Sequence, residues 1–325
     1  MQRMRRPGQK VFGRSISWPR LSWLFDPPRI ESLRWLWRAV VLCSVFTTLA
    51  GCAWLDAKQR ELALRPTPGR PADFAGLRAG DEIFNVAVPA ARPGATTTTA
   101  DQLQLWWLPN ADPQAPTLLY LHGTFRSLYQ SNPRKMEALR NAGFAIVAVD
   151  YRGWGESTPI LPSESTIYAD AQVAWAELVR RQPDPHKRVL FGHSMGSAVA
   201  VELARARHAG TDYGALVLEA AFTRLPDVAR SVGVVGIVAS WFATLEFDSA
   251  AKIGQVDAPI LMLHGTADRT VPFALGEKLR DVAPKGTRWI AFEGGSHSGL
   301  DLESPDKYRD AMRSVIALLM PSKPH

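Results

Sequence analysis

The sequence has little of what several classes of protein require. Its 325 residues contain only two cysteines, Cys43 and Cys52, which cannot build a disulfide framework. No set of His, Cys, Asp and Glu has the spacing of a metal site, and no glycine-rich loop follows a strand in the form that binds dinucleotides. The sequence therefore implies no metal and no other cofactor. It also contains no internal repeat.

The net charge of +7 belongs to one end of the chain. Nine of the 38 basic and two of the 31 acidic residues lie in residues 1–51, which leaves 29 of each kind in residues 52–325. A neutral main part offers no electrostatic footprint for nucleic acid, so we expect no nucleic-acid partner. Hydrophobic residues make up 46% of the chain and charged residues 21%, which predicts a packed globular domain rather than a disordered chain.

Residues 1–51 have the pattern of an export signal. The uncharged run 39–51 directly follows the basic residues Arg34 and Arg38. A signal-peptide core needs about 7 to 15 apolar residues, whereas a membrane-spanning helix needs roughly 20. The run therefore predicts a signal peptide. The basic region before it is longer than the basic region of most such leaders.

The end of this run, Leu49-Ala50-Gly51-Cys52, resembles the bacterial lipoprotein box. The resemblance implies cleavage before Cys52 and a lipid anchor on that cysteine. It further implies a location in the bacterial cell envelope, at the periplasmic face of the outer membrane. Two or more acyl chains hold a protein on a bilayer, at about 0.8 kcal/mol per buried methylene. The alternative is an uncleaved short anchor in which Cys52 is an ordinary thiol.

The rest of the chain divides into a linker and one domain. Residues 52–80 are rich in Arg, Pro and Gly and predict a linker or a loosely packed arm. Residues 81–88 and 102–108 predict two antiparallel strands, joined by an exposed loop over 89–100.

From residue 117 onward, apolar runs alternate with helical periodicity. The predicted strands are 117–121, 145–150, 189–192, 215–219, 259–263 and 288–292. The predicted helices are 134–142, 168–181, 196–208, 273–282 and 305–319. Repeated β-α units whose strands are apolar throughout predict a mainly parallel sheet with helices on both faces.

A serine lies at the junction of one predicted strand and helix. Gly192-His193-Ser194-Met195-Gly196 follows an apolar strand and opens a helix of small residues. A nucleophile elbow has this form, because glycines two positions either side of the serine avoid collision with neighbouring backbone. The pattern predicts that the Ser194 hydroxyl points outward as a nucleophile.

A serine hydroxyl needs a positioned base, and the base needs a buried acid to orient it. His297 lies in a glycine-rich loop after the last predicted strand, and Asp268 follows the strand before it. We predict these as base and acid, with Asp150 as the rival acid. We expect the backbone amides of Met195 and Thr124 to form the oxyanion hole. The histidines His122, His193 and His264 are interpreted as structural.

With these motifs, the sequence resembles the α/β-hydrolase superfamily over about residues 80–320. The resemblance is carried by six blocks: His122-Gly123-Thr124, residues 150–157, residues 168–175, residues 192–196, residues 264–268 and Gly295-Ser296-His297. They are similar to a branch of membrane-associated serine hydrolases that includes protein depalmitoylases. The resemblance implies an α/β-hydrolase fold over 81–321, with a small lid insertion at 222–258. That insertion is either a lid over the site or a surface helix.

The expected function is a serine hydrolase that cleaves a carboxylic ester or thioester through an acyl-enzyme intermediate. Its expected partners are a small-molecule or lipid-like acyl ester as substrate and a membrane, reached through the anchor on Cys52. Two alternatives remain open. One is a serine peptidase of the same fold, and the other is a non-catalytic envelope scaffold.

Overall fold

The computed structural model describes residues 30–90, 100–130, 132–234, 236, 240 and 243–320. The chain forms two compact units, Met1–Ala53 and Trp54–His325. The basic leader up to residue 29 and the loop residues 91–99 lie outside the described residues. The second unit carries all the residues predicted to form the active site.

The first described element is the helix α1, Ile30–Leu64, which contains the uncharged run 39–51. Its part Trp37–Leu64 is long and apolar enough to cross a membrane, by length and composition, as a signal sequence near the start of a chain also is. Cys52 is helical and exposed. The signal peptide and the lipid anchor therefore stay predictions.

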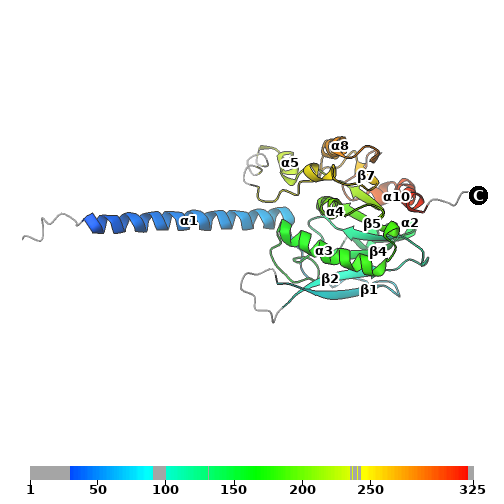
Figure 1. The fold of residues 1–325 in the computed structure, drawn as a ribbon, viewed down its shortest axis with the longest axis horizontal. Helices are drawn as coiled ribbons and strands as arrows, with labels where there is room; N and C mark the ends of the chain where they lie inside the picture. Colours follow the sequence, from blue (N-terminus) through cyan, green and yellow to red (C-terminus); the bar gives the residue numbers. More distant parts are fainter. Residues whose placement is uncertain are drawn as a thin grey trace, which may run out of the picture. The chain divides into compact units, whose positions relative to one another are not determined.

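The second unit is built on one eight-stranded sheet, of which β1, β2, β4, β5 and β7 are labelled from bottom to top in Figure 1. Its strands are β1 Glu82–Val88, β2 Asp101–Leu108, β3 Thr117–Leu121, β4 Ala145–Asp150, β5 Arg188–His193, β6 Ala215–Glu219, β7 Ile260–Gly265 and β8 Arg288–Phe292. Their order across the sheet is β1-β2-β4-β3-β5-β6-β7-β8. The pairs β1–β2 and β2–β4 are antiparallel and the others are parallel. The predicted mainly parallel sheet, preceded by two antiparallel strands, is confirmed.

Helices cover both faces of this sheet, as predicted. Among the described residues the helices are α2 Asn132–Ala142, α3 Glu164–Arg181, α4 Met195–Arg205, α5 Leu225–Arg230, α7 Ala250–Ile253, α8 Phe273–Val282, α9 Leu300–Glu303 and α10 Pro305–Leu319, and Pro185–Lys187 forms a 3₁₀ turn. Buried side chains of α3, α4 and α8 form one hydrophobic cluster, and those of α2 and α10 form the other. The central strands β3 to β7 are buried along their whole length, because helices exclude water from both of their faces.

The segment predicted as a linker differs from that expectation. Residues 54–64 continue α1, and the side chain of Leu64 is fully buried. The chain then pairs with the domain through a bridge between Pro68 and Gly155. Further along, the Phe74 ring contacts Trp106. Apolar side chains scattered among Arg, Pro and Gly give no period, so the sequence did not reveal this packing.

The sheet has a topological switch point at β3. The next strand in the chain, β4, lies on one side of β3, and the strand after it, β5, lies on the other side. In open α/β sheets, ligands bind at the carboxyl ends of the strands near such a point. The loops after β3 and β5 therefore flank the expected site.

Candidate active site

Ser194 occupies a strained turn between β5 and α4. Its φ is 55° and its ψ is −122°, a conformation that side-chain-bearing residues rarely adopt. The turn requires glycine on both sides, since a Cβ on Gly192 would lie 2.3 Å from the Gly196 oxygen and one on Gly196 would lie 2.0 Å from the Leu121 oxygen. The Ser194 amide donates to the main-chain oxygen of Glu219, 2.9 Å away. This turn is the nucleophile elbow that the sequence predicts.

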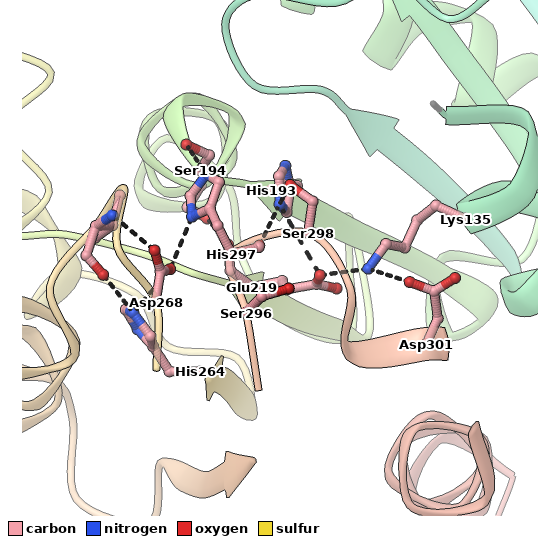
Figure 2. A network of polar contacts seen from close by, with 12 residues as sticks. Lys135, His193, Ser194, Glu219, His264, Asp268, Ser296, His297, Ser298 and Asp301 are labelled. Atoms are coloured by element: carbon pink, nitrogen blue, oxygen red, sulfur yellow. Dashed lines mark hydrogen bonds and ion pairs between the residues drawn. The ribbon is translucent and has the colours of Figure 1, made fainter. Parts of the chain in front are cut away.

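The structure brings the three predicted residues of the triad together, and Figure 2 shows them in a row. His297 Nε2 lies 3.1 Å from Ser194 Oγ, and His297 Nδ1 lies 2.7 Å from Asp268 Oδ2. With Nδ1 donating to the carboxylate, Nε2 is left to accept the serine proton. The arrangement provides a nucleophile, a base and an acid in contact.

Asp268 is held as a carboxylate by the groups around it. Burial alone raises its pKa, but hydrogen bonds from His264 and His297 and the amide of Val271 outweigh burial and hold the pKa well below its usual range. The Oδ1 atom accepts from the amides of Thr270 and Val271, each 2.8 Å away. Asp268 is therefore negatively charged at neutral pH.

The rival acid, Asp150, lies elsewhere. Its Oδ1 accepts from the Leu128 amide at 2.8 Å and lies 3.4 Å from His122 Nε2. Burial raises the pKa of Asp150 to about 8. A carboxyl that is largely protonated at neutral pH and in contact with a different histidine is a poor partner for His297.

The two predicted oxyanion donors are the first residue of α4 and a residue of the loop after β3. Met195 is the first residue of α4, so its amide has no partner within the helix and lies at the positive end of the helix dipole. Thr124 lies in the loop after β3. That loop passes close to the nucleophile, since a Cβ on Gly123 would lie 3.0 Å from Ser194 Cβ.

The next residue of this loop, Phe125, connects it to α1. Its amide donates to the Leu64 oxygen at 3.3 Å, and the guanidinium of Arg65 lies 4.4 Å from the centre of its ring. Phe125 has a φ of 76° and an exposed ring. The last residue of the helix therefore holds the loop that carries Thr124.

A pocket of about 600 Å³ opens beside Ser194 and His297, a volume that suits a small organic molecule. Its other walls include Tyr120, Phe125, Arg126, Lys135, Arg269 and Thr270. The described residues of the predicted lid insertion 222–258, which include α5 and α7, are not among its walls. Among the described residues, no group of three or more His, Cys, Asp or Glu is placed to hold a metal ion.

The sequence did not reveal a buried ionic network beside the site. Lys135 Nζ contacts Glu219 Oε1 at 2.5 Å and Asp301 Oδ1 at 2.9 Å, as Figure 2 shows. Arg134 also pairs with Asp301, and the Tyr308 hydroxyl donates to Glu219. The only sequence signal was Glu219 itself, a charged residue at the end of an otherwise apolar strand.

The three histidines interpreted as structural are all buried and hydrogen-bonded. His122 Nδ1 lies 2.6 Å from the Gly123 oxygen, and His264 Nε2 lies 3.0 Å from the Val271 oxygen. His193 Nε2 lies 3.0 Å from the main-chain oxygen of His297. His264 supports Asp268 and His193 supports the loop of His297, so two of the three stabilise the triad.

Comparison with solved structures shows which known proteins share this fold. An esterase from Pyrococcus furiosus superimposes with a TM-score of 0.58 at 16% identity, over 77% of this chain and 96% of the esterase. An alpha-beta hydrolase from Vibrio vulnificus gives a TM-score of 0.55 at 24% identity, over 71% of this chain and 81% of that one. These similarities concern the fold.

Sequence comparison identifies the family itself. The family described as serine aminopeptidase S33 matches residues 112–250. An uncharacterised protein of Mycobacterium tuberculosis strain CDC 1551 is 30% identical over 289 residues, which cover 86% of this chain and 95% of that protein. The chain belongs to the α/β-hydrolase superfamily. The predicted fold and the predicted class of serine hydrolase are thereby confirmed.

A further relative of this hydrolase carries a named activity. The lysophosphatidylserine lipase ABHD12 of zebrafish is 31% identical over 192 residues, or 55% of this chain. The hydrolase spans half the length of that lipase.

Proposed function

We propose that this hydrolase cleaves a carboxylic ester of a lipid-like substrate through an acyl-enzyme intermediate, at a membrane surface. Ser194 Oγ attacks the ester carbonyl carbon while His297 Nε2 takes the hydroxyl proton. His297 then gives that proton to the leaving alcohol, and the C–O bond breaks. Water activated by the same imidazole releases the acid and regenerates the serine.

The observation that carries this proposal is the pair of contacts made by His297. The imidazole lies within hydrogen-bond reach of both Ser194 Oγ, at 3.1 Å, and the Asp268 carboxylate, at 2.7 Å. Asp268 stabilises the imidazolium that forms during the attack, because its own charge is fixed. The amides of Met195 and Thr124 stabilise the negative charge on the carbonyl oxygen.

The named activities of the relatives favour an ester over a thioester, and the pocket also disfavours a peptide. The structural neighbour from Pyrococcus furiosus is an esterase, and the zebrafish relative is a lipase. An aminopeptidase needs an acidic group to bind the charged amino terminus of its substrate. The pocket residues that the structure describes include no Asp and no Glu. The peptidase alternative therefore lacks its recognition element in this part of the chain.

The location at a membrane rests on the start of the chain. Cys52 stands at the end of a lipoprotein-like run and precedes Leu64 by twelve residues. Twelve residues of chain span at most about 43 Å. Leu64 in turn is hydrogen-bonded to the loop of the pocket. A lipid anchor on Cys52 therefore restricts the pocket to the neighbourhood of the bilayer, where lipid esters are concentrated.

The mechanism is tested on the full chain in detergent with a fluorophosphonate probe, which acylates activated serines. We expect labelling of the wild type and of Ser231→Ala, an exposed serine on another loop, and none of Ser194→Ala. Equal labelling of all three, or of none, contradicts the mechanism. Turnover of p-nitrophenyl esters of graded chain length, compared with aminoacyl anilides, then distinguishes esterase from peptidase.

The anchor is tested by the intact mass of the protein purified from bacterial membranes. We expect a chain that begins at an acylated Cys52, and an uncleaved chain for Cys52→Ala. A wild-type mass that equals the whole unmodified chain supports the uncleaved anchor instead.

A further inference from the structure

Two arginines on the pocket wall have no partner within the part of the chain that the structure describes. Arg126 and Arg269 both line the pocket and are both exposed. Neither forms an ion pair or a hydrogen bond with any described residue. In the same domain Arg134, Arg140 and Arg152 each pair with a carboxylate. The two arginines that face the pocket are thus left with free donors.

The remaining charges around the pocket compensate one another. Lys135 and Arg134 carry two positive charges, and their partners Glu219 and Asp301 carry two negative ones. The side chain of Asp268, the acid of the triad, is fully buried and is hydrogen-bonded to His297 and to the amides of Thr270 and Val271. The charges left facing the pocket space from the described walls are therefore those of the two arginines.

The fold holds these arginines on the two sides of the nucleophile. Arg126 follows Thr124 by two residues in the loop after β3, and Arg269 follows Asp268 directly in the loop after β7. In the sheet, β3 lies on one side of β5 and β7 lies on the other, beyond β6. A substrate whose ester lies at Ser194 thus has an unpaired guanidinium available on each side.

We infer that Arg126 and Arg269 bind an anionic group of the substrate, a carboxylate or a phosphate located outside the ester that is cleaved. A guanidinium presents a planar fork of donors that matches either oxyanion and stays charged at every working pH. This inference rests on the proposed function and adds to it the chemical class of the substrate. It predicts that the hydrolase prefers anionic esters to neutral esters of equal size.

The test uses short, soluble substrates in matched pairs, so that no bilayer takes part. One pair is monohexanoylglycerol and its 3-phosphate, and the other is p-nitrophenyl pentanoate and p-nitrophenyl hydrogen glutarate. The measured quantity is the ratio of kcat/KM for the anionic ester to that for the neutral ester. The glycerol pair reports recognition of a phosphate and the nitrophenyl pair reports recognition of a carboxylate.

We expect Arg126→Ala and Arg269→Ala each to lower this ratio by about tenfold in at least one pair, which is the size of one partly exposed charged hydrogen bond. Charge reversal by Arg→Glu lowers the ratio further, and added salt lowers the wild-type ratio. We expect the lower kcat/KM for the anionic ester to come mainly from a higher KM. Arg313→Ala changes an exposed arginine on α10 that does not line the pocket, and it keeps the wild-type ratio.

Three outcomes overturn the inference. A ratio that is unchanged in both pairs means that the arginines are simply solvated. An equal loss on neutral and anionic esters means that they support the loops and not the substrate. If the ratio is unchanged in both soluble pairs while the two Arg→Ala variants bind vesicles of anionic lipid more weakly than the wild type in a separate assay, the arginines bind the membrane surface. Failure of the proposed function itself is distinguished by the neutral esters and the fluorophosphonate probe, which then give no turnover and no labelling.

Discussion

The imidazole of His193 is hydrogen-bonded to the main chain of His297, with 3.0 Å between Nε2 and the carbonyl oxygen. A carbonyl oxygen only accepts, so Nε2 of His193 carries the proton. Burial, together with the nearby His297, lowers the pKa of His193 to about 3, which keeps the ring neutral in this arrangement. The residue beside the nucleophile in sequence therefore positions the base.

Removing this contact is expected to slow catalysis without preventing folding. In His193→Ala the His297 loop loses its donor, and a displacement of the base by about 1 Å costs up to about 100-fold in rate. We expect kcat to fall about 10- to 100-fold with little change in KM, and His193→Gln, which keeps a donor, to recover part of the loss. His208→Ala is the control, because this histidine is exposed and does not line the pocket. A loss in KM alone would show that His193 contacts substrate instead.

The two candidate acids are separated by matched substitutions. Asp268→Asn removes the charge that orients His297 and is expected to lower kcat by about 10⁴-fold. Asp150→Asn keeps an oxygen acceptor for the Leu128 amide and is expected to leave kcat within about tenfold of the wild type. Steady-state hydrolysis of a p-nitrophenyl ester measures both. The opposite ranking would assign the acid to Asp150.

The stability of the fold should depend on pH through the same Asp150. Its pKa is raised from 3.8 to about 8, so between these values the folded state holds a proton that the unfolded chain has lost. The contribution of this carboxyl to the free energy of unfolding is therefore largest below pH 4 and decreases as the pH rises toward 8. Burial lowers the pKa of His122 from 6.5 to about 4. This histidine therefore makes the free energy of unfolding rise with pH, but only below about pH 6.5, the pKa of a histidine in the unfolded chain.

Between pH 6.5 and 8, of these two groups, Asp150 is therefore the one that changes the free energy of unfolding. We expect the wild type to lose on the order of 1–2 kcal/mol of unfolding free energy over this interval relative to Asp150→Asn. Urea unfolding at pH 6.5, 7.2 and 8.0 provides the measurement. Parallel curves for the two proteins would mean that the carboxyl is already ionised in the folded state.

The buried network around Lys135 is expected to matter for stability. Lys135→Met leaves Glu219 and Asp301 without the Nζ atom between them, and breaking a buried ion pair in this way costs about 3–5 kcal/mol. Lys278→Met, at an exposed position of α8, is the control and should change stability by less than about 0.5 kcal/mol. Adding Glu219→Gln to Lys135→Met should recover part of the loss, because it removes one uncompensated charge. A cost equal to that of the control would contradict a stabilising role for this network.

The sequence predicted the parts of the molecule that depend on local pattern. The strands 145–150, 215–219 and 288–292 and the helices 273–282 and 305–319 have the bounds that the structure gives them, because continuous apolar runs and helical periods are local signals. The contacts among Ser194, His297 and Asp268 also followed, since parallel strands bring the loops at their carboxyl ends to one edge.

What the sequence did not provide depends on contacts between distant segments. Lys135 and Glu219 are 84 residues apart, and nothing in either neighbourhood indicates the other. The packing of residues 54–80 against the domain likewise involves isolated side chains such as Leu64 and Phe74, which have no period. The sequence also does not distinguish the two pocket arginines from other surface arginines. Whether an arginine is paired with a carboxylate depends on the tertiary contacts of the folded domain.

The hydrogen bond between Leu64 and Phe125 sets a lower limit on the catalytic fragment. A fragment that starts at residue 81, just before the first strand of the sheet, lacks the acceptor for the Phe125 amide, the buried Leu64 side chain and the Arg65 guanidinium over the Phe125 ring. Its pocket loop has to reorganise. A fragment that begins at Trp54 keeps all three contacts, so the pocket loop retains its support from the end of α1.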